Sequence, residues 1–177
     1  ISSKGEHIIF QPSEKYGTTL FLAAAKAGMK SLCGRMLRYP IQCHMYFVDE
    51  DGYTAFMYVC INHMDHTAFN MLSTPNLCNL EQINKDGFAA INYINPYRAE
   101  KVILKLLQAN RPCGLHQQNS QGLTPLMVAC ACKNEIVALE ILNKFTTCGL
   151  YSKNPSNQTA FDIAVFNNLK DTSNTII

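Results

Sequence analysis

The sequence contains no apolar run long enough to cross a membrane and no recognisable signal peptide. It also lacks a glycine-rich phosphate loop, a nucleophile elbow and a pair of carboxylates at a spacing typical of acid–base catalysis. Charged residues make up only 16% of the chain and the net charge is +2, well short of the basic footprint of a nucleic-acid-binding domain. We therefore expect no membrane insertion, no catalysis and no nucleic-acid binding.

What the chain does contain is a repeat of 35 residues. Glycine stands at this interval four times and asparagine takes the fifth place, at Gly17, Gly52, Gly87, Gly122 and Asn157. Two residues later the column reads Thr19, Thr54, Ala89, Thr124 and Thr159, and two further on it reads Phe21, Phe56, Ile91, Leu126 and Phe161. Because several columns repeat together, the sequence predicts a stack of similar units, each touching only its neighbours.

Each unit is predicted to hold a polar turn followed by two short helices. Asp51-Gly52 is typical of such turns, because glycine adopts backbone angles that other residues resist. A threonine then begins the first helix, and Pro125 is acceptable there because its missing donor would be unpaired anyway. The second helix shows the spacing of one apolar face, as in Val137 and Ile141. The predicted fold class is all-α.

Cysteine forms the most unusual column, at Cys43, Cys78, Cys113 and Cys148. Stacked helices lie roughly 10 Å apart, whereas the Cα atoms joined by a disulfide lie within about 7 Å. Thiols that act as small buried apolar side chains fit this spacing better than disulfides do. We therefore expect a reducing, intracellular location, which we take to be cytoplasmic.

The repeated columns resemble the ankyrin repeat family, whose pattern runs glycine, any residue, Thr-Pro-Leu-His, any residue, Ala-Ala. The copy at residues 122–130 reads GLTPLMVAC, and the resemblance covers nearly the whole chain. It implies an ankyrin-repeat solenoid of stacked helix-turn-helix units with hairpin-like turns. It also implies a protein partner, bound on the concave side by the turn tips and the exposed ends of the first helices.

The sequence departs from the family pattern in three places. The histidine slot holds Leu22, Met57, Asn92, Met127 and Asp162, so the family's threonine–histidine hydrogen bond should be missing. The period is 35 rather than the usual 33 or so, and we expect the extra length after the second helix, as at residues 73–76. In the third unit, Pro96 should end the first helix early.

We interpret residues 1–177 as a single repeat domain excised from a longer polypeptide. Residues 1–13 are expected to be the tail of a preceding unit. The units are expected to span about 14–48, 49–83, 84–118, 119–153 and 154–177. We expect the chain to be monomeric.

Metal binding is the alternative explanation for some cysteines and histidines. Cys60, His63 and His66 have ligand-like spacing, as do Cys113 and His116, and zinc favours such donors. However, Cys60 and Cys113 both occupy repeated columns that are expected to face the interior. We therefore expect no metal and no cofactor.

Charge alternates between units. Residues 49–83 hold five acidic residues and no lysine or arginine, while residues 1–48 and 84–118 are net basic. A peptide of mixed charge could find its register on such a surface. An ordinary solvated surface is the alternative reading.

The predicted function is a non-catalytic scaffold or adaptor module for protein–protein interaction. The alternative is a substrate-recruitment or regulatory arm of a larger enzyme. Tyr53 and Phe88 are expected to be exposed anchors, although they could instead pack on the adjacent turn. The candidate partner-binding residues are Glu50, Asp51, Tyr53, Ile61, Asn62, Lys85, Asp86, Phe88, Tyr97, Leu123 and Cys132.

Overall fold

The computed structural model describes residues 18–109, 113–144 and 148–177. Within these residues every regular element is a helix, and the β pairing consists of one isolated bridge between Val48 and Thr54. The all-α prediction is therefore confirmed. The elements are α2 (Leu20–Lys26), α3 (Lys30–Met36), α4 (Ala55–Ile61), α5 (Asp65–Met71), η1 (Pro75–Leu77), η2 (Ala90–Tyr93), α6 (Glu100–Gln108), α7 (Pro125–Ala131), α8 (Glu135–Lys144), α9 (Ala160–Phe166) and α10 (Lys170–Ile176).

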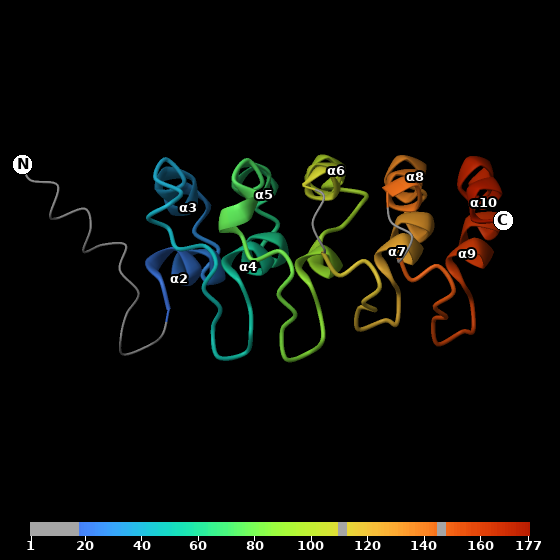
Figure 1. The fold of residues 1–177 in the computed structure, drawn as a ribbon, viewed down its shortest axis with the longest axis horizontal. Coiled ribbons are helices and arrows are strands. Elements are labelled where there is room, and N and C mark those ends of the chain that lie inside the picture. The colour runs from blue at the N-terminus through green and yellow to red at the C-terminus, as the bar shows by residue number, and fades with distance from the viewer. Residues whose placement is uncertain (1–17, 110–112, 145–147) are drawn as a thin grey trace, which may run out of the picture.

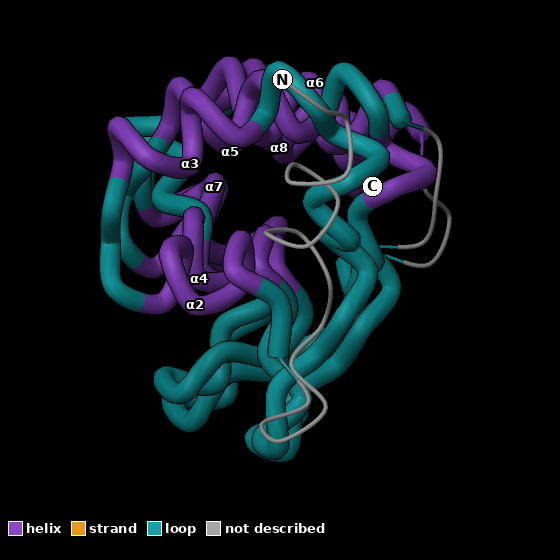
Figure 2. The backbone as a smooth tube through the Cα atoms, turned by 90° about the vertical axis from the view of Figure 1, so that its left-hand side faces the viewer, coloured by secondary structure: helices purple, strands orange, loops and turns teal. Residues whose placement is uncertain are grey.

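The helices stand in pairs, and the pairs follow one another in a row (Figure 1). The first helices pack on one another, as α2 does on α4, α4 on η2 and α7 on α9. The second helices form a parallel row in which α5 packs on α6, α6 on α8 and α8 on α10. Seen along the row, the two rows form two layers, and the turns that precede the first helices project beyond them (Figure 2).

Among the described residues, threonine starts four of the five first helices. Each hydroxyl accepts a hydrogen bond from the backbone N–H three residues later, at 3.1–3.3 Å, which satisfies one donor at the open end of the helix. The N–H group that donates to each threonine belongs to the position at which the ankyrin pattern has histidine. The four residues are Thr19, Thr54, Thr124 and Thr159.

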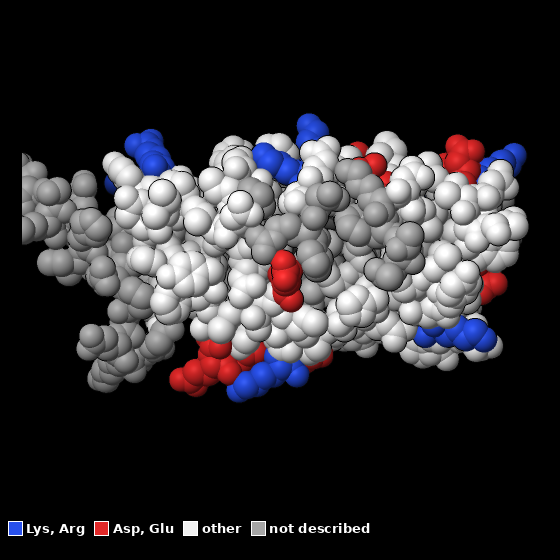
Figure 3. Space-filling model, in the orientation of Figure 1, with Lys and Arg blue, Asp and Glu red and all other residues white. Residues whose placement is uncertain are grey.

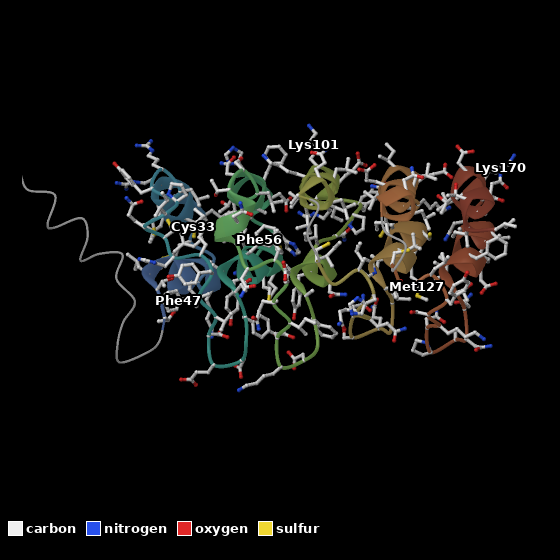
Figure 4. The ribbon with its side chains drawn as sticks, in the orientation of Figure 1. Cys33, Phe47, Phe56, Lys101, Met127 and Lys170 are labelled. Atoms are coloured by element: carbon white, nitrogen blue, oxygen red, sulfur yellow. The ribbon has the colours of Figure 1, made fainter. Side chains whose placement is uncertain are left out.

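The core is built from the repeated columns. Phe56 and Met127 are fully buried inside the array, whereas Lys101 and Lys170 point outward from the second helices (Figure 4). The cysteine column is buried too, and the thiols of Cys43 and Cys78 donate to the carbonyls of Met36 and Met71, the last residues of α3 and α5, at 3.2 and 3.5 Å. The four members of this column therefore pack as small interior side chains. They are Cys43, Cys78, Cys113 and Cys148.

The third unit is irregular, as Pro96 predicts. Its first helix is the four-residue 3₁₀ turn η2, whereas the other first helices have seven residues. Ala89 supplies no capping hydroxyl, so the backbone N–H of Ala89 donates to the side chain of Asn92 instead, at 3.0 Å. The extra length predicted after the second helix of unit two, at residues 73–76, overlaps the start of η1. Residues 1–13 and Gly17 lie outside the described residues.

Candidate functional site

Four projecting turns share a side-chain acceptor that recurs every 35 residues. In each turn its oxygen accepts a hydrogen bond from the backbone N–H four residues later, at 2.9–3.0 Å, and a backbone hydrogen bond between the same two residues runs the other way. Short carboxylate and amide side chains favour turns for this reason. Sequence reasoning missed this column, although its interval is visible in the sequence. The acceptors are Asp49, Asn84, Asn119 and Asn154.

We define the first-helix face as turn residues 49–53, 84–88, 119–123 and 154–158 together with the exposed sides of α2, α4, η2, α7 and α9 and the exposed residues that lead from these helices to the second helices, such as Tyr97. Figure 3 shows acidic and basic side chains gathered on the projecting turns at the bottom of the view, below the units that contain α2, α4 and η2. The acceptor column holds the backbone of these turns in one conformation, which determines where the side chains at their tips begin.

An aromatic cluster crosses this face between units two and three. We call Tyr53, Tyr58, Phe88 and Tyr93 the aromatic cluster. The rings of Tyr53 and Tyr58 are stacked, with centroids 5.1 Å apart and planes at 19°. Tyr93 lies 6.0 Å from Tyr53, and Phe88 meets Tyr93 edge to face at 6.0 Å. Each aromatic pair in such a geometry contributes about 0.5–1.5 kcal/mol in addition to the free energy gained by burying its area.

Hydrogen bonds tie the cluster to the turn of unit three. The amide of Asn84 donates to the hydroxyl of Tyr93 at 2.8 Å, which donates to the hydroxyl of Tyr53 at 3.4 Å. Tyr53 donates in turn to a carboxylate oxygen of Asp86 at 2.9 Å. The hydrogen bond to Tyr93, reinforced by burial and by Asp86, raises the pKa of Tyr53 above its ordinary value. Tyr53 is therefore a neutral donor at physiological pH, held in place by its neighbours.

Asp49 joins the cluster to unit one. Its Oδ2 accepts a hydrogen bond from Tyr58 at 2.6 Å and from Lys26 at 3.0 Å, and the ammonium of Lys26 lies 5.2 Å from the centre of the Tyr58 ring. Burial opposes ionisation of Asp49, but the hydrogen bonds from Tyr58, the Tyr53 N–H and Lys26 outweigh it and lower its pKa. The hydrogen bonds to Tyr58 and Asp49 raise the pKa of Lys26. Both groups are therefore charged at neutral pH.

A hollow of about 230 Å³ opens beside this ion pair, between the first and second units. Its volume is below the roughly 300 Å³ at which drug-sized ligand pockets begin, so it suits a single side chain. One cation and three carboxylates line it. The lining residues are Thr18, Leu22, Ala23, Lys26, Asp49, Glu50 and Asp51.

The predicted turn residues lie together on this face. Glu50 is exposed at the tip of the second turn, and Asp51 pairs with Lys85 of the next turn at 3.4 Å, where both side chains are about two-thirds exposed. Such exposed pairs contribute between 0 and about 1 kcal/mol. Asp86 accepts from Tyr53, while Leu123 is half-buried against the core.

The predicted residues at the ends of the first helices differ in exposure. Tyr97 is 80% exposed, whereas Ile61 and Cys132 are half-buried. The amide of Asn62 donates to the carbonyl of Ala25 in the preceding unit at 2.9 Å, so this residue links two units. Tyr97 is therefore the freest of these four side chains to meet a partner.

Sequence reasoning also missed the residues that complete the cluster. Tyr58 and Tyr93 occupy one column, 35 residues apart, and Val128 holds the next place in it. All three are half-buried. Ala23 holds the first place in this column, so its residue type changes from unit to unit. The column therefore cannot be recognised by looking for a recurring residue type.

The residues with ligand-like spacing do not form a metal site among the described residues. Cys60 is buried, and burial, helped by the charges of Asp65 and Cys78, raises the pKa of its thiol, whereas His63 and His66 are exposed. Across the described ranges, no three histidine, cysteine or acidic side chains are grouped so that they could hold a metal ion. None of the eight cysteines forms a disulfide.

A search of protein-family models and a search of curated proteins each found no match to this chain. Among residues 18–109, 113–144 and 148–177, no helix combines the length and apolarity that a membrane crossing requires. Fold and site together define an all-helical protein of paired helices in a row, with an aromatic cluster on its first-helix face.

Proposed function

We propose that this chain is an ankyrin-type repeat domain that binds a protein partner through its first-helix face and performs no chemistry of its own. The observation that carries the proposal is the aromatic cluster, which spans two units and is held by hydrogen bonds from both. Tyrosine is enriched at binding hot spots because it offers a large apolar ring with a polar tip.

Three further features support the proposal. The turns are fixed by the acceptor column before any partner arrives, which reduces the ordering cost of association. Tyr97 lies in unit three, as Phe88 and Tyr93 do, and its side chain is 80% exposed. The buried, high-pKa thiols suit a scaffold rather than a nucleophile, since burial raises the pKa of both Cys113 and Cys130 to about 12. They also suit the reducing, cytoplasmic location expected from the sequence.

Site-specific photo-crosslinking tests the proposal with a matched control. A photoreactive phenylalanine analogue replaces either Tyr97 or Tyr151, two tyrosines that are 80% and 86% exposed. Tyr151 lies in the segment between α8 and the fifth turn, and such segments run down the side opposite the first helices (Figure 2). We expect a defined protein adduct from position 97 and none from position 151. Equal adducts at both positions, or none at 97, would refute the proposal.

A further inference from the structure

We propose that the partner presents a basic segment, and that one arginine of this segment enters the hollow between the first and second units while its neighbours lie along the aromatic cluster. This inference rests on the proposed function, because it specifies the chemistry of the partner that the first-helix face binds.

The chain's own Lys26 shows what this surface accepts. Its ammonium sits on the carboxylate of Asp49 at 3.0 Å and over the ring of Tyr58 at 5.2 Å. A cation here gains both a charge-assisted hydrogen bond and an interaction with an aromatic face. Arginine makes both kinds of contact better than lysine, because its planar guanidinium stacks on rings and bonds carboxylates in pairs.

Charge remains for a second cation. Lys26 offsets only one of the three carboxylates that line the hollow, and Glu50 forms no ion pair with the residues that the structure describes. Asp51 is paired with Lys85 at 3.4 Å, but both side chains are about two-thirds exposed, so a partner cation can replace the lysine at little cost. The hollow thus carries an uncompensated negative charge next to the aromatic cluster.

The surrounding unit agrees with this assignment. Residues 49–83 hold five acidic residues and no lysine or arginine, so the field over the second unit attracts cations and repels a polyanion. The aromatic cluster continues from the hollow into the third unit, and a bound segment that follows it would pass Asp86. An extended basic segment therefore meets carboxylates at both ends of the cluster.

Three fluorescent probes of equal length test this assignment by anisotropy. They are a twelve-residue peptide that alternates arginine with serine, the same peptide with glutamate in place of arginine, and a twelve-nucleotide oligothymidine. We expect the wild-type chain to bind the arginine peptide and neither of the others. Tighter binding of the glutamate peptide or of the oligonucleotide would overturn the inference.

Variants of equal charge locate the binding. Glu50→Gln with Asp51→Asn neutralises two exposed side chains of the hollow, and Asp65→Asn with Asp171→Asn removes the same charge from the second helices. We expect about tenfold weaker binding in the first variant and none of this loss in the second, because only the first removes contacts to the cation. Equal losses in both variants would mean that net charge alone attracts the peptide, and would contradict the inference.

A third variant should act in the opposite direction. Lys26→Gln frees Asp49 and the ring of Tyr58, so we expect the arginine peptide to bind a few-fold more tightly. Unchanged or weaker binding in a variant whose circular dichroism is unaltered would contradict the proposed position of the arginine. If the adduct at position 97 forms but the arginine peptide does not compete with it, this inference fails while the proposed function stands. If no adduct forms at position 97, the proposed function itself fails.

Discussion

Replacing Asn119 with alanine removes the acceptor that holds the fourth turn. The side-chain oxygen of Asn119 accepts hydrogen bonds from the N–H groups of Gln121 and Leu123, each at 3.0 Å. A typical intramolecular hydrogen bond contributes about 0.5–1.5 kcal/mol. We therefore expect the free energy of unfolding to fall by about 2 kcal/mol, and the midpoint of thermal unfolding to fall by about 4–8 °C for a domain of this size.

Two matched variants make this result specific to the acceptor. Asn119→Asp keeps an oxygen in the same place, as Asp49 does in the second turn, so its midpoint should stay close to that of the wild type at pH 7. Ser120→Ala alters an exposed residue of the same turn and should have no measurable effect. Thermal unfolding followed by circular dichroism measures all three variants. An alanine variant as stable as the wild type, or an aspartate variant as unstable as the alanine one, would refute the reasoning.

Three further predictions concern a close contact within unit three and two ionisable groups. Gly114 and Gly87 both have positive φ. A Cβ at position 114 would meet the side chain of Ala89, whereas one at position 87 meets nothing, so G114A should unfold at least about 1 kcal/mol more easily than G87A. Equal losses in denaturant titrations would argue against close packing of Gly114 on Ala89 within unit three. Cys132 is half-buried whereas the other seven cysteines are buried, so an aromatic disulfide reagent should modify a single thiol of the native chain. The C132S variant should not react. Several fast-reacting thiols would show that the cysteine column is not buried. The folded-state pKa of Asp49 lies below its unfolded value of about 4, so its ionisation stabilises the fold above that pH and this stability is lost as the pH falls further. The D49N variant should therefore be less stable than the wild type at pH 7, and the difference in stability should disappear on acidification. A difference that is constant with pH would contradict this assignment.

Much of the fold could be predicted because the columns that stack the units are restricted in chemistry. Thr54 must cap a helix, and Phe56 must fill an interior space, so both recur in recognisable form at each interval. Pro96 likewise predicted the short first helix of unit three, because proline lacks the N–H that a longer helix would use. Wherever local backbone chemistry allows few residue types, the repeat is readable from one sequence.

The candidate site was less predictable because its residues are free to vary. Tyr53 and Phe88 were expected as exposed anchors or as residues packed on the next turn, and the structure shows each ring packed against other aromatic residues. The partners Tyr58 and Tyr93 were not recognised, because their column holds alanine and valine in other units. The hydrogen bond from Lys26 to Asp49 joins units one and two, and such a contact depends on how the units pack rather than on a local pattern.

The central claim is that each 35-residue unit lies beside the next, so that equivalent residues form straight columns along one face. Ser31, Lys101 and Asp171 occupy one such column at exposed positions of the second helices, two units apart in each step. Unnatural amino acids that carry spin labels can be placed at these three positions. Pulsed electron paramagnetic resonance then measures the distances between the labels. With packed helices about 10 Å apart, the account predicts about 20 Å between positions 31 and 101 and about 40 Å between 31 and 171. Similar distances for both pairs would show that the units do not form a row, and would contradict the account.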